Sequence, residues 1–194
     1  MTFEELDLNK TYSYADYLLW AFKERLELLR GKVFKMSPAP NSRHQFISGE
    51  IFFQLRKFLD SKSCRVFTAP FDVRLPQKNS DGSPKNTFTV VQPDICVICD
   101  LKKIDTRGCI GAPDLVVEIL SPGNTEREMK DKFAIYEEYG IKEYWLIEPR
   151  DKVLLVYILN EEGKYIGLRP FVATDTFKSP TIIGFELSIK ELFE

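Results

Sequence analysis

The chain has 194 residues, 44% of them hydrophobic and 29% charged, and its formal net charge at pH 7 is −2. A chain of this length buries roughly 70% of its unfolded surface, enough for a sizeable core in one domain spanning residues 1–194. No apolar run could span a membrane, no signal peptide leads the chain, and the charge gives no overall support for nucleic-acid binding, although a local patch can provide it. We therefore expect a cytoplasmic protein whose four cysteines are reduced thiols.

The first sixty residues predict a helix, a hairpin and a longer helix. Ser13 can cap a helix that continues to about residue 23. Residues 26–36 alternate in polarity around an Arg-Gly pair, which favours a hairpin, although their start could instead extend the first helix. Pro38 and Pro40 then break the chain before a second helix over residues 41–60.

The middle of the chain predicts strands separated by a loop. Residues 65–75 have the composition of one or two strands bent at Pro70, and residues 76–86 form a polar loop. Residues 90–99 and 115–120 are short apolar runs typical of buried strands. We expect these strands to belong to one α/β domain, because no repeat or linker separates them.

A third helix and several shorter elements complete the chain. The residues from Thr125 onward have the form of a capping box, and Gly140 ends the helix that the box begins. Further strands are expected at residues 142–147, 153–159, 164–168 and 181–183, followed by a helical turn at 188–193.

Cys96 and Cys99 are spaced like two ligands of a zinc site. Residues with an odd separation in a strand point to opposite faces of the sheet, and the chain has no second pair with this spacing. We therefore expect these two side chains to pack in the core rather than to bind zinc.

One carboxylate stands out because it lies in an apolar strand. Residues 114–120 are Asp-Leu-Val-Val-Glu-Ile-Leu, with Glu118 near the centre. Burial of an isolated carboxylate is strongly unfavourable, and a metal ion is a common compensation. A structural ion pair is the alternative explanation for Glu118.

Asp94 follows Pro93 in the preceding apolar run, 24 positions before Glu118 (118 minus 94), so the two can lie on neighbouring strands. Two adjacent carboxylates repel and raise one pKa, whereas Mg²⁺ or Mn²⁺ held between them removes that penalty. We therefore interpret Asp94 and Glu118 as metal ligands. The alternative for Asp94 is a residue that caps a turn at the start of the strand.

Metal-assisted phosphodiester hydrolysis also needs a cation near the carboxylates. The strand does not provide it, because Leu120 occupies the position two residues beyond Glu118. On the third helix, Lys132 lies about 60° from the centre of the apolar stripe and can extend along that face toward Glu118. The alternative is a solvated pair with Glu128, worth only ~0.3–0.5 kcal/mol, and the residues alone favour neither.

Four segments form a distinctive set: Gln92-Pro93-Asp94, the run from Gly111 to Pro122, Lys132-x-x-x-Tyr136, and the run from Gly140 to Leu146. Together they resemble the Uma family of endonucleases, which belongs to the PD-(D/E)XK, restriction-endonuclease-like superfamily. The resemblance covers about residues 27–149 and is most specific in its central block.

The resemblance implies a mixed α/β, restriction-endonuclease-like fold, with a central mixed β-sheet flanked by helices and with an N-terminal helix and β-hairpin. It implies that Asp94 and Glu118 are catalytic metal ligands and that Lys132 is a catalytic lysine moved from the strand to the helix. Glu27, in the predicted hairpin, would be a fourth catalytic residue. The chain departs from the family pattern at Lys32, which replaces a usual acidic residue, and at Glu128, which replaces a common aspartate.

The resemblance further implies dependence on Mg²⁺ or Mn²⁺, DNA as the substrate, and a homodimer, since cleavage of two strands usually involves paired subunits. Two other functions remain open from the residues. The chain could be a non-catalytic nucleic-acid-binding or protein-interaction module that keeps the fold, or a metal-dependent phosphoesterase acting on a small nucleotide.

Other polar and aromatic residues have simpler interpretations. For Glu27, the residues support a solvent-facing strand position and a place in the site equally. Asp114 fits a turn, and His44, the only histidine, fits a cap or surface position better than a catalytic base. Tyr144 and Trp145 enter an apolar strand and are expected in the core or in an interface.

Overall fold

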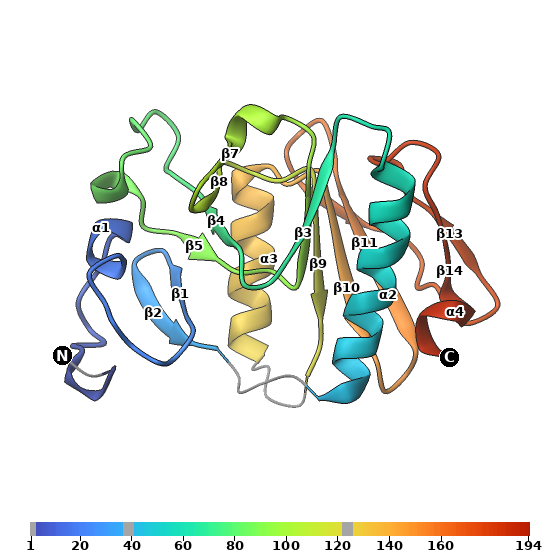
Figure 1. Cartoon of the computed structure of the whole chain (residues 1–194), viewed down its shortest axis with the longest axis horizontal. Helices are drawn as coiled ribbons and strands as arrows, with labels where there is room; N and C mark the ends of the chain where they lie inside the picture. Colours follow the sequence, from blue (N-terminus) through green and yellow to red (C-terminus); the bar gives the residue numbers. More distant parts are fainter. Residues whose placement is uncertain (1–2, 37–40, 122–125) are drawn as a thin grey trace.

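The structure is a computed structural model that describes residues 3–36, 41–121 and 126–194, without the side chains of residues 126–128. Its elements are layered around a central sheet (Figure 1). Helix α2 (Ser42–Leu59) covers one face of this sheet, and helix α3 (Glu126–Tyr139) lies on the opposite side. A second sheet and the short helix α1 (Tyr14–Tyr17) lie on the same side as α3.

The strands form two six-stranded sheets and one separate hairpin within the described ranges. The central sheet has the order β12 (Tyr165–Gly167), β11 (Val153–Leu159), β10 (Glu143–Glu148), β9 (Leu115–Ile119), β6 (Ile95–Ile98) and β3 (Arg65–Thr68). The outer sheet has the order β2 (Lys32–Lys35), β1 (Leu26–Leu29), β5 (Val90–Val91), β4 (Asp72–Arg74), β8 (Gly108–Ile110) and β7 (Ile104–Asp105). The hairpin contains β13 (Thr176–Lys178) and β14 (Glu186–Ser188), and α4 (Ile189–Phe193) follows it.

The pairing of the strands makes the central sheet mixed. β9 and β10 run parallel with α3 between them in sequence, whereas β6 and β11 run antiparallel to their neighbours. Parallel strands joined through a helix place their carboxyl ends at the same edge of the sheet. This edge, together with the first turn of α2, lies at the bottom of Figure 1.

Alternation along β9 directs its side chains into two cores. Leu115, Val117 and Ile119 pack in the core beneath α2, whereas Val116 packs in the core beneath α3. Because side chains two positions apart share a face, Glu118 lies on the α3 side with Val116. The alternation of side chains along β9 therefore places the Glu118 carboxylate on the side of α3.

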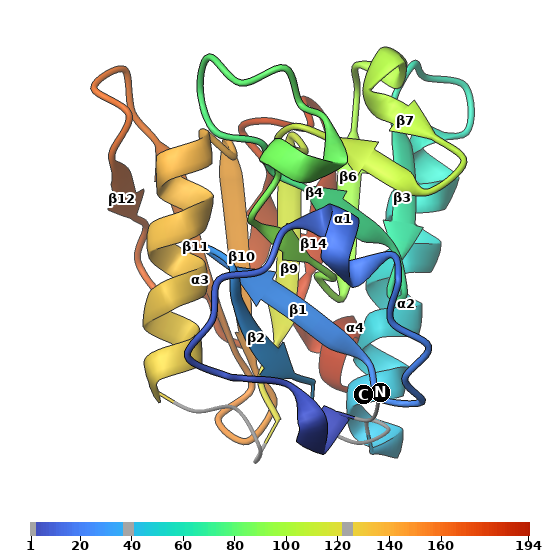
Figure 2. The same cartoon turned by 90° about the vertical axis from the view of Figure 1, so that its left-hand side faces the viewer.

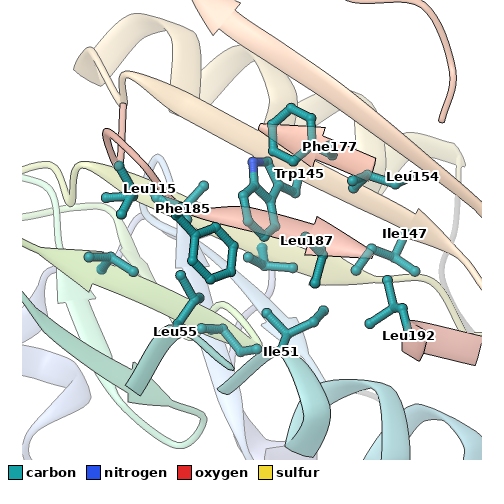
Figure 3. Packing of buried hydrophobic residues seen from close by; sticks show 14 of the residues in the cluster. Ile51, Leu55, Leu115, Trp145, Ile147, Leu154, Phe177, Phe185, Leu187 and Leu192 are labelled. Atoms are coloured by element: carbon teal, nitrogen blue, oxygen red, sulfur yellow. The ribbon is translucent and has the colours of Figure 1, made fainter. Parts of the chain in front are cut away.

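The core beneath α2 is closed by the C-terminal hairpin. Trp145 of β10 lies between Phe177 and Phe185, with ring centroids 5.3 and 6.1 Å from that of its indole (Figure 3). Ile51 and Leu55 of α2 line the same core and are fully buried. Trp145 is therefore a core residue, as its apolar strand predicts.

A buried carboxylate fixes the C-terminal hairpin to the central sheet. Glu143 has no exposed surface, and it accepts a hydrogen bond from the indole N–H of Trp145 at 2.6 Å. Its other oxygen accepts the Ser179 hydroxyl and the Thr181 backbone N–H, both at 2.9 Å. Since both oxygens are satisfied, this charge has a structural explanation without a ligand.

Helix α2 has a well-defined start and one exposed apolar stripe. Asn41 is its N-cap and accepts the backbone N–H of His44 at 2.9 Å. On the outer face, Phe46 and Phe53 are 50% and 58% exposed. Within the part of the chain that the structure describes, no helix is both long and apolar enough to span a membrane.

The link between β5 and β6 carries the chain from the outer sheet to the central sheet. Gln92 anchors this link: its backbone N–H donates to Glu27, and its side-chain amide donates to Asp72 and Tyr17. Its side-chain carbonyl accepts the guanidinium of Arg25. The hairpin of β1 and β2 is thereby held on the α3 side of the central sheet (Figures 1 and 2).

Most of the predicted elements are present. The hairpin over residues 26–36 and the helix over residues 41–60 are confirmed by β1, β2 and α2. The third helix is confirmed by α3, but the capping box from Thr125 and the break at Pro38 and Pro40 lie outside the described residues.

Three predicted elements differ from the structure. The first helix ends at Tyr17 instead of near residue 23, and the chain beyond it folds back so that Trp20 packs against both Tyr12 and Tyr17. The apolar run at 90–99 is divided between two sheets at Pro93. The strand predicted at 181–183 is wrong, since this segment forms the turn between β13 and β14.

The expectation of four reduced thiols is wrong for Cys64 and Cys99, which form a disulfide. The antiparallel register of β3 and β6 pairs Arg65 with Ile98, so the two cysteines come opposite each other one position further along. Cys96 and Cys99 pack on opposite sides of the central sheet, which confirms the predicted facing.

Gly108 is required where β8 approaches β4. Its φ is +131°, and a Cβ atom there would lie 2.1 Å from the backbone oxygen of Asp72. We expect Gly108→Ala to lower the free energy of unfolding by about 2–4 kcal/mol, measured by urea denaturation. Gly49→Ala is the matched control: nothing lies near a Cβ atom there, and it should stabilise α2 by about 0.5–1 kcal/mol. Unchanged stability of Gly108→Ala would contradict this packing.

Candidate active site

Asp94 and Glu118 lie at the same edge of two adjacent strands. Ile95 of β6 pairs with Val117 of β9, so the next position outward places Asp94 beside Glu118. Asp94 Oδ2 also accepts the backbone N–H of Ile119 at 2.8 Å. The Asp94 carboxylate is therefore tied to the strand that carries Glu118, which confirms their predicted positions on neighbouring strands.

Lys132 reaches this edge from α3 and is buried. Its Nζ lies 3.1 Å from Oε1 of Glu118 and 3.1 Å from Oε1 of Glu27. Because only 7% of the lysine side chain is exposed, the alternative of a solvated pair on the helix surface is wrong. The stem runs along the apolar face of α3, and the ammonium group lies between two carboxylates.

Glu27 enters the site from the outer sheet. It lies on β1, is 1% exposed, and accepts the backbone N–H of Gln92 at 2.7 Å through the oxygen that also contacts Lys132. The solvent-facing alternative for Glu27 is therefore wrong. Its contact with the other site residues is made through Lys132, so its position suits a group that holds the lysine.

Tyr136 makes a further contact with Glu118. It lies one turn after Lys132 on α3, and its hydroxyl donates to Glu118 Oε1 at 2.5 Å. Burial raises the pKa of Glu118 to about 7; the charges of Asp94 and Glu27 add to the rise, while Lys132 and the Tyr136 hydrogen bond oppose it. Burial and the charge of Glu118 also raise the pKa of Tyr136, so its hydroxyl remains a donor.

His44 contacts Asp94 from the first turn of α2. Its Nε2 lies 3.2 Å from Asp94 Oδ2, and the residue is 7% exposed. Burial alone would lower the pKa of His44, but its hydrogen bond to Asp94 and the charges of Asp94 and Glu118 outweigh this effect and raise the pKa. The buried Nδ1 has no hydrogen-bond partner among the described residues. The expected surface position of His44 is therefore wrong.

One oxygen of each strand carboxylate remains available for a ligand. In the described ranges, the hydrogen bonds of these carboxylates go to Asp94 Oδ2 and Glu118 Oε1, which leaves Asp94 Oδ1 and Glu118 Oε2. The same ranges contain no cluster of three His, Cys, Asp or Glu side chains that could hold a metal ion. Mg²⁺ commonly binds one or two carboxylates and completes its shell with water and substrate phosphate, so this donor set fits it.

Asp114 lies outside this group. Its carboxylate accepts the backbone N–H of Cys99 at 2.8 Å and the ammonium group of Lys142 at 2.7 Å. These contacts join the start of β9 to the end of β6, and they agree with the structural role expected from the sequence.

The structure thus brings together Glu27, Asp94, Glu118 and Lys132, the four residues singled out from the sequence. Sequence reasoning missed the Tyr136 hydroxyl, although the spacing Lys132-x-x-x-Tyr136 places both side chains on one helix face. It also missed the contact between His44 and Asp94, for which no local signal exists because the two residues are far apart in sequence.

Comparisons with known proteins identify the family and the fold of the chain. The family model described as "Uma2: Putative restriction endonuclease" matches residues 14–190. The uncharacterized protein slr1290 of Synechocystis sp. is 24% identical over 181 residues, covering 92% of this chain and 89% of that protein. A crystal structure from Anabaena variabilis, titled "putative nuclease belonging to DUF820", matches with a TM-score of 0.72 and 20% identity, covering 94% of this chain and 97% of that one. The predicted restriction-endonuclease-like fold and the family resemblance are confirmed.

The contacts of Lys132 predict that substitutions of Lys132 and Glu27 have coupled effects on the free energy of unfolding. Lys132→Met should lower the free energy of unfolding by about 3–5 kcal/mol in EDTA, because it leaves Glu27 and Glu118 buried without their cation. Adding Glu27→Gln should restore part of this stability, since one uncompensated charge is removed. Urea denaturation measures both effects.

The matched control is Lys142→Met, which removes a lysine whose side chain is 65% exposed from its pair with Asp114. This change should alter stability by no more than about 1 kcal/mol. If the double variant is less stable than Lys132→Met alone, the coupling between Glu27 and Lys132 is absent.

Proposed function

We propose that the chain, which belongs to the Uma2 family, is a divalent-metal-dependent endonuclease that hydrolyses phosphodiester bonds of DNA. The observation that carries the proposal is the buried ammonium group of Lys132, 3.1 Å from Glu118, at the sheet edge that also presents Asp94. Metal-assisted phosphoryl hydrolysis uses this combination of two carboxylates and a cation. A cytoplasmic location belongs to the proposal, because the enzyme must share a compartment with DNA.

In this proposal Asp94 and Glu118 hold Mg²⁺ or Mn²⁺ through Asp94 Oδ1 and Glu118 Oε2, the oxygens that accept no hydrogen bond from the described residues. When bound, the ion polarises the scissile phosphate and lowers the pKa of the attacking water. Burial raises the pKa of Glu118, the charges of Asp94 and Glu27 add to the rise, and Lys132 only partly offsets it, so a bound cation would stabilise this carboxylate. Hard oxygen donors favour Mg²⁺ or Mn²⁺ over zinc.

Lys132 is the proposed catalytic lysine. Its ammonium group would contact the reacting phosphate and stabilise the negative charge that develops on it. Glu27 and Tyr136 are positioning residues: Glu27 holds the lysine from the outer sheet, and Tyr136 fixes the Glu118 oxygen that faces the protein interior. His44 positions Asp94 in the same way from α2.

We further propose that the enzyme is a homodimer formed through α2. Phe46 and Phe53 lie two turns apart on one face of this helix and are both at least half exposed. An antiparallel pair of α2 helices about a twofold axis would place Phe46 of each subunit against Phe53 of the other, so the stripe is self-complementary. This arrangement would bury four aromatic rings at the centre of the contact.

Substitution of the three proposed catalytic residues should separate metal binding from turnover. Glu118→Gln and Asp94→Asn should abolish Mn²⁺ binding measured by calorimetry, whereas Lys132→Met should retain it. All three should lower the rate of Mg²⁺-dependent plasmid cleavage by at least ~100-fold.

Glu162→Gln, in the exposed turn between β11 and β12, is the matched control and should leave both measurements unchanged. Circular dichroism establishes that each variant is folded. Full cleavage activity of Glu118→Gln would eliminate the proposed metal pair, and Mn²⁺ binding without any cleavage by the wild-type chain would eliminate the nuclease activity.

The dimer proposal predicts that the molecular mass in solution rises with protein concentration, and that substitutions on the exposed face of α2 abolish this rise. Phe46→Ser/Phe53→Ser should shift the protein to monomer in sedimentation velocity at concentrations where the wild-type chain is dimeric. Ile183→Ser removes an apolar side chain that is 76% exposed elsewhere, and it should leave the dimer intact. A wild-type chain that stays monomeric at all concentrations, or a dimeric double variant, would refute this interface.

A further inference from the structure

A cavity of about 360 Å³ opens next to the candidate active site. Its walls come from the first turn of α2, the residues that follow β9, the start of α3 and the residues that follow β10. It therefore lies at the edge where the parallel strands β9 and β10 end. Its volume falls within the range of about 300–1,000 Å³ that is typical of pockets for small ligands.

The cavity adjoins the carboxylates of the site. His44 lines the cavity and contacts Asp94 Oδ2 at 3.2 Å. Leu120, another lining residue, is two positions beyond Glu118, and its backbone N–H is held by the carbonyl of Ile147 on β10. A strand bound with one phosphate at the carboxylates would therefore continue into this cavity.

The charges around the cavity favour an anion. Arg43 and Arg150 both line it, both are exposed, and neither guanidinium forms an ion pair with any residue in the described ranges. The N-terminus of α2, an 18-residue helix, adds a partial positive charge at the same wall. Glu148 is the opposing charge, and its carboxylate accepts the backbone N–H of Arg150 at 2.9 Å. Among the residues that line the cavity, two guanidinium groups and a helix N-terminus outweigh this one carboxylate.

The cavity is also lined by three apolar residues. Leu120, Met129 and Pro149 contribute side chains that cannot bind a phosphate but can contact a sugar or the face of a base. Cationic and apolar groups in the same cavity match the two chemical parts of a nucleotide.

We propose that this cavity binds one nucleotide of the DNA strand next to the scissile phosphate. Its phosphate contacts Arg43 and Arg150, and its base lies against Leu120, Met129 and Pro149. A base held in a cavity of this size is not stacked in a duplex, so the substrate strand is unpaired at this nucleotide. The inference rests on the proposed nuclease function and specifies its substrate class as single-stranded or locally opened DNA.

Nucleotide binding can be tested without metal or turnover. Thymidine 5′-monophosphate is titrated into the full chain in EDTA and followed by calorimetry, for the wild type, Arg43→Ala, Arg150→Ala and Arg107→Ala. Arg107 lies in the turn between β7 and β8, so its variant loses the same charge away from the cavity. We expect at least ~10-fold weaker binding for Arg43→Ala and Arg150→Ala, and wild-type affinity for Arg107→Ala. Absence of binding, or equal affinity in all four proteins, overturns the proposal.

A cleavage assay then separates this proposal from the nuclease function. With Mg²⁺, a single-stranded oligonucleotide should be cleaved at least ~10-fold faster than the same sequence in a duplex, and Arg43→Ala should raise KM for the single strand without changing kcat. Cleavage with equal rates on both substrates and an unchanged KM overturns the cavity proposal alone. The remaining combination is that the wild-type chain cleaves neither substrate, while Arg43→Ala and Arg150→Ala still weaken nucleotide binding. This result supports the cavity proposal and rejects the nuclease function.

Discussion

The buried contact of Lys132 with Glu27 and Glu118 joins the parts of this fold. The lysine comes from α3, Glu27 from the outer sheet and Glu118 from the central sheet, so one ammonium group connects three elements that are distant in sequence. Ions removed from water are stable only when their partners are placed well. The packing of the outer sheet against α3 and β9 must therefore be maintained for these charges to remain buried.

The same contact leaves an excess of negative charge at the edge of the central sheet. Glu27, Glu118 and Asp94 carry three carboxylates, whereas Lys132 provides one fixed cation, and the charges of Asp94 and Glu27 add to the rise that burial causes in the pKa of Glu118. Glu118 also divides its oxygens: Oε1 is held by Lys132 and Tyr136, while Oε2 makes no hydrogen bond in the described ranges. This division presents a negatively charged oxygen in a fixed direction, which is what a divalent cation requires.

The extent to which the site could be predicted depends on how local each signal is. Glu118 is visible because a charge is anomalous in an apolar strand. Helical spacing makes Lys132 a candidate, but the family resemblance is what favours it over a solvated pair. The partnership of Lys132 with Glu27, and that of His44 with Asp94, depend on how two sheets and a helix pack together. Strand pairing across such distances has no local signature, and the disulfide between Cys64 and Cys99 escaped prediction for the same reason.

Because its lysine lies on a helix, the proposed site is complete only after that helix has packed on the central sheet. A lysine two residues beyond Glu118 would share its strand, and forming that strand would already bring the two charges together; Leu120 occupies this position instead. Lys132 arrives only when α3 packs on the central sheet, and it is then held by Glu27 of the outer sheet. Assembly of the site therefore requires tertiary packing of all three elements. Substitutions that loosen α3 should reduce activity before they unfold the sheet, because the lysine is oriented by packing rather than by its own strand.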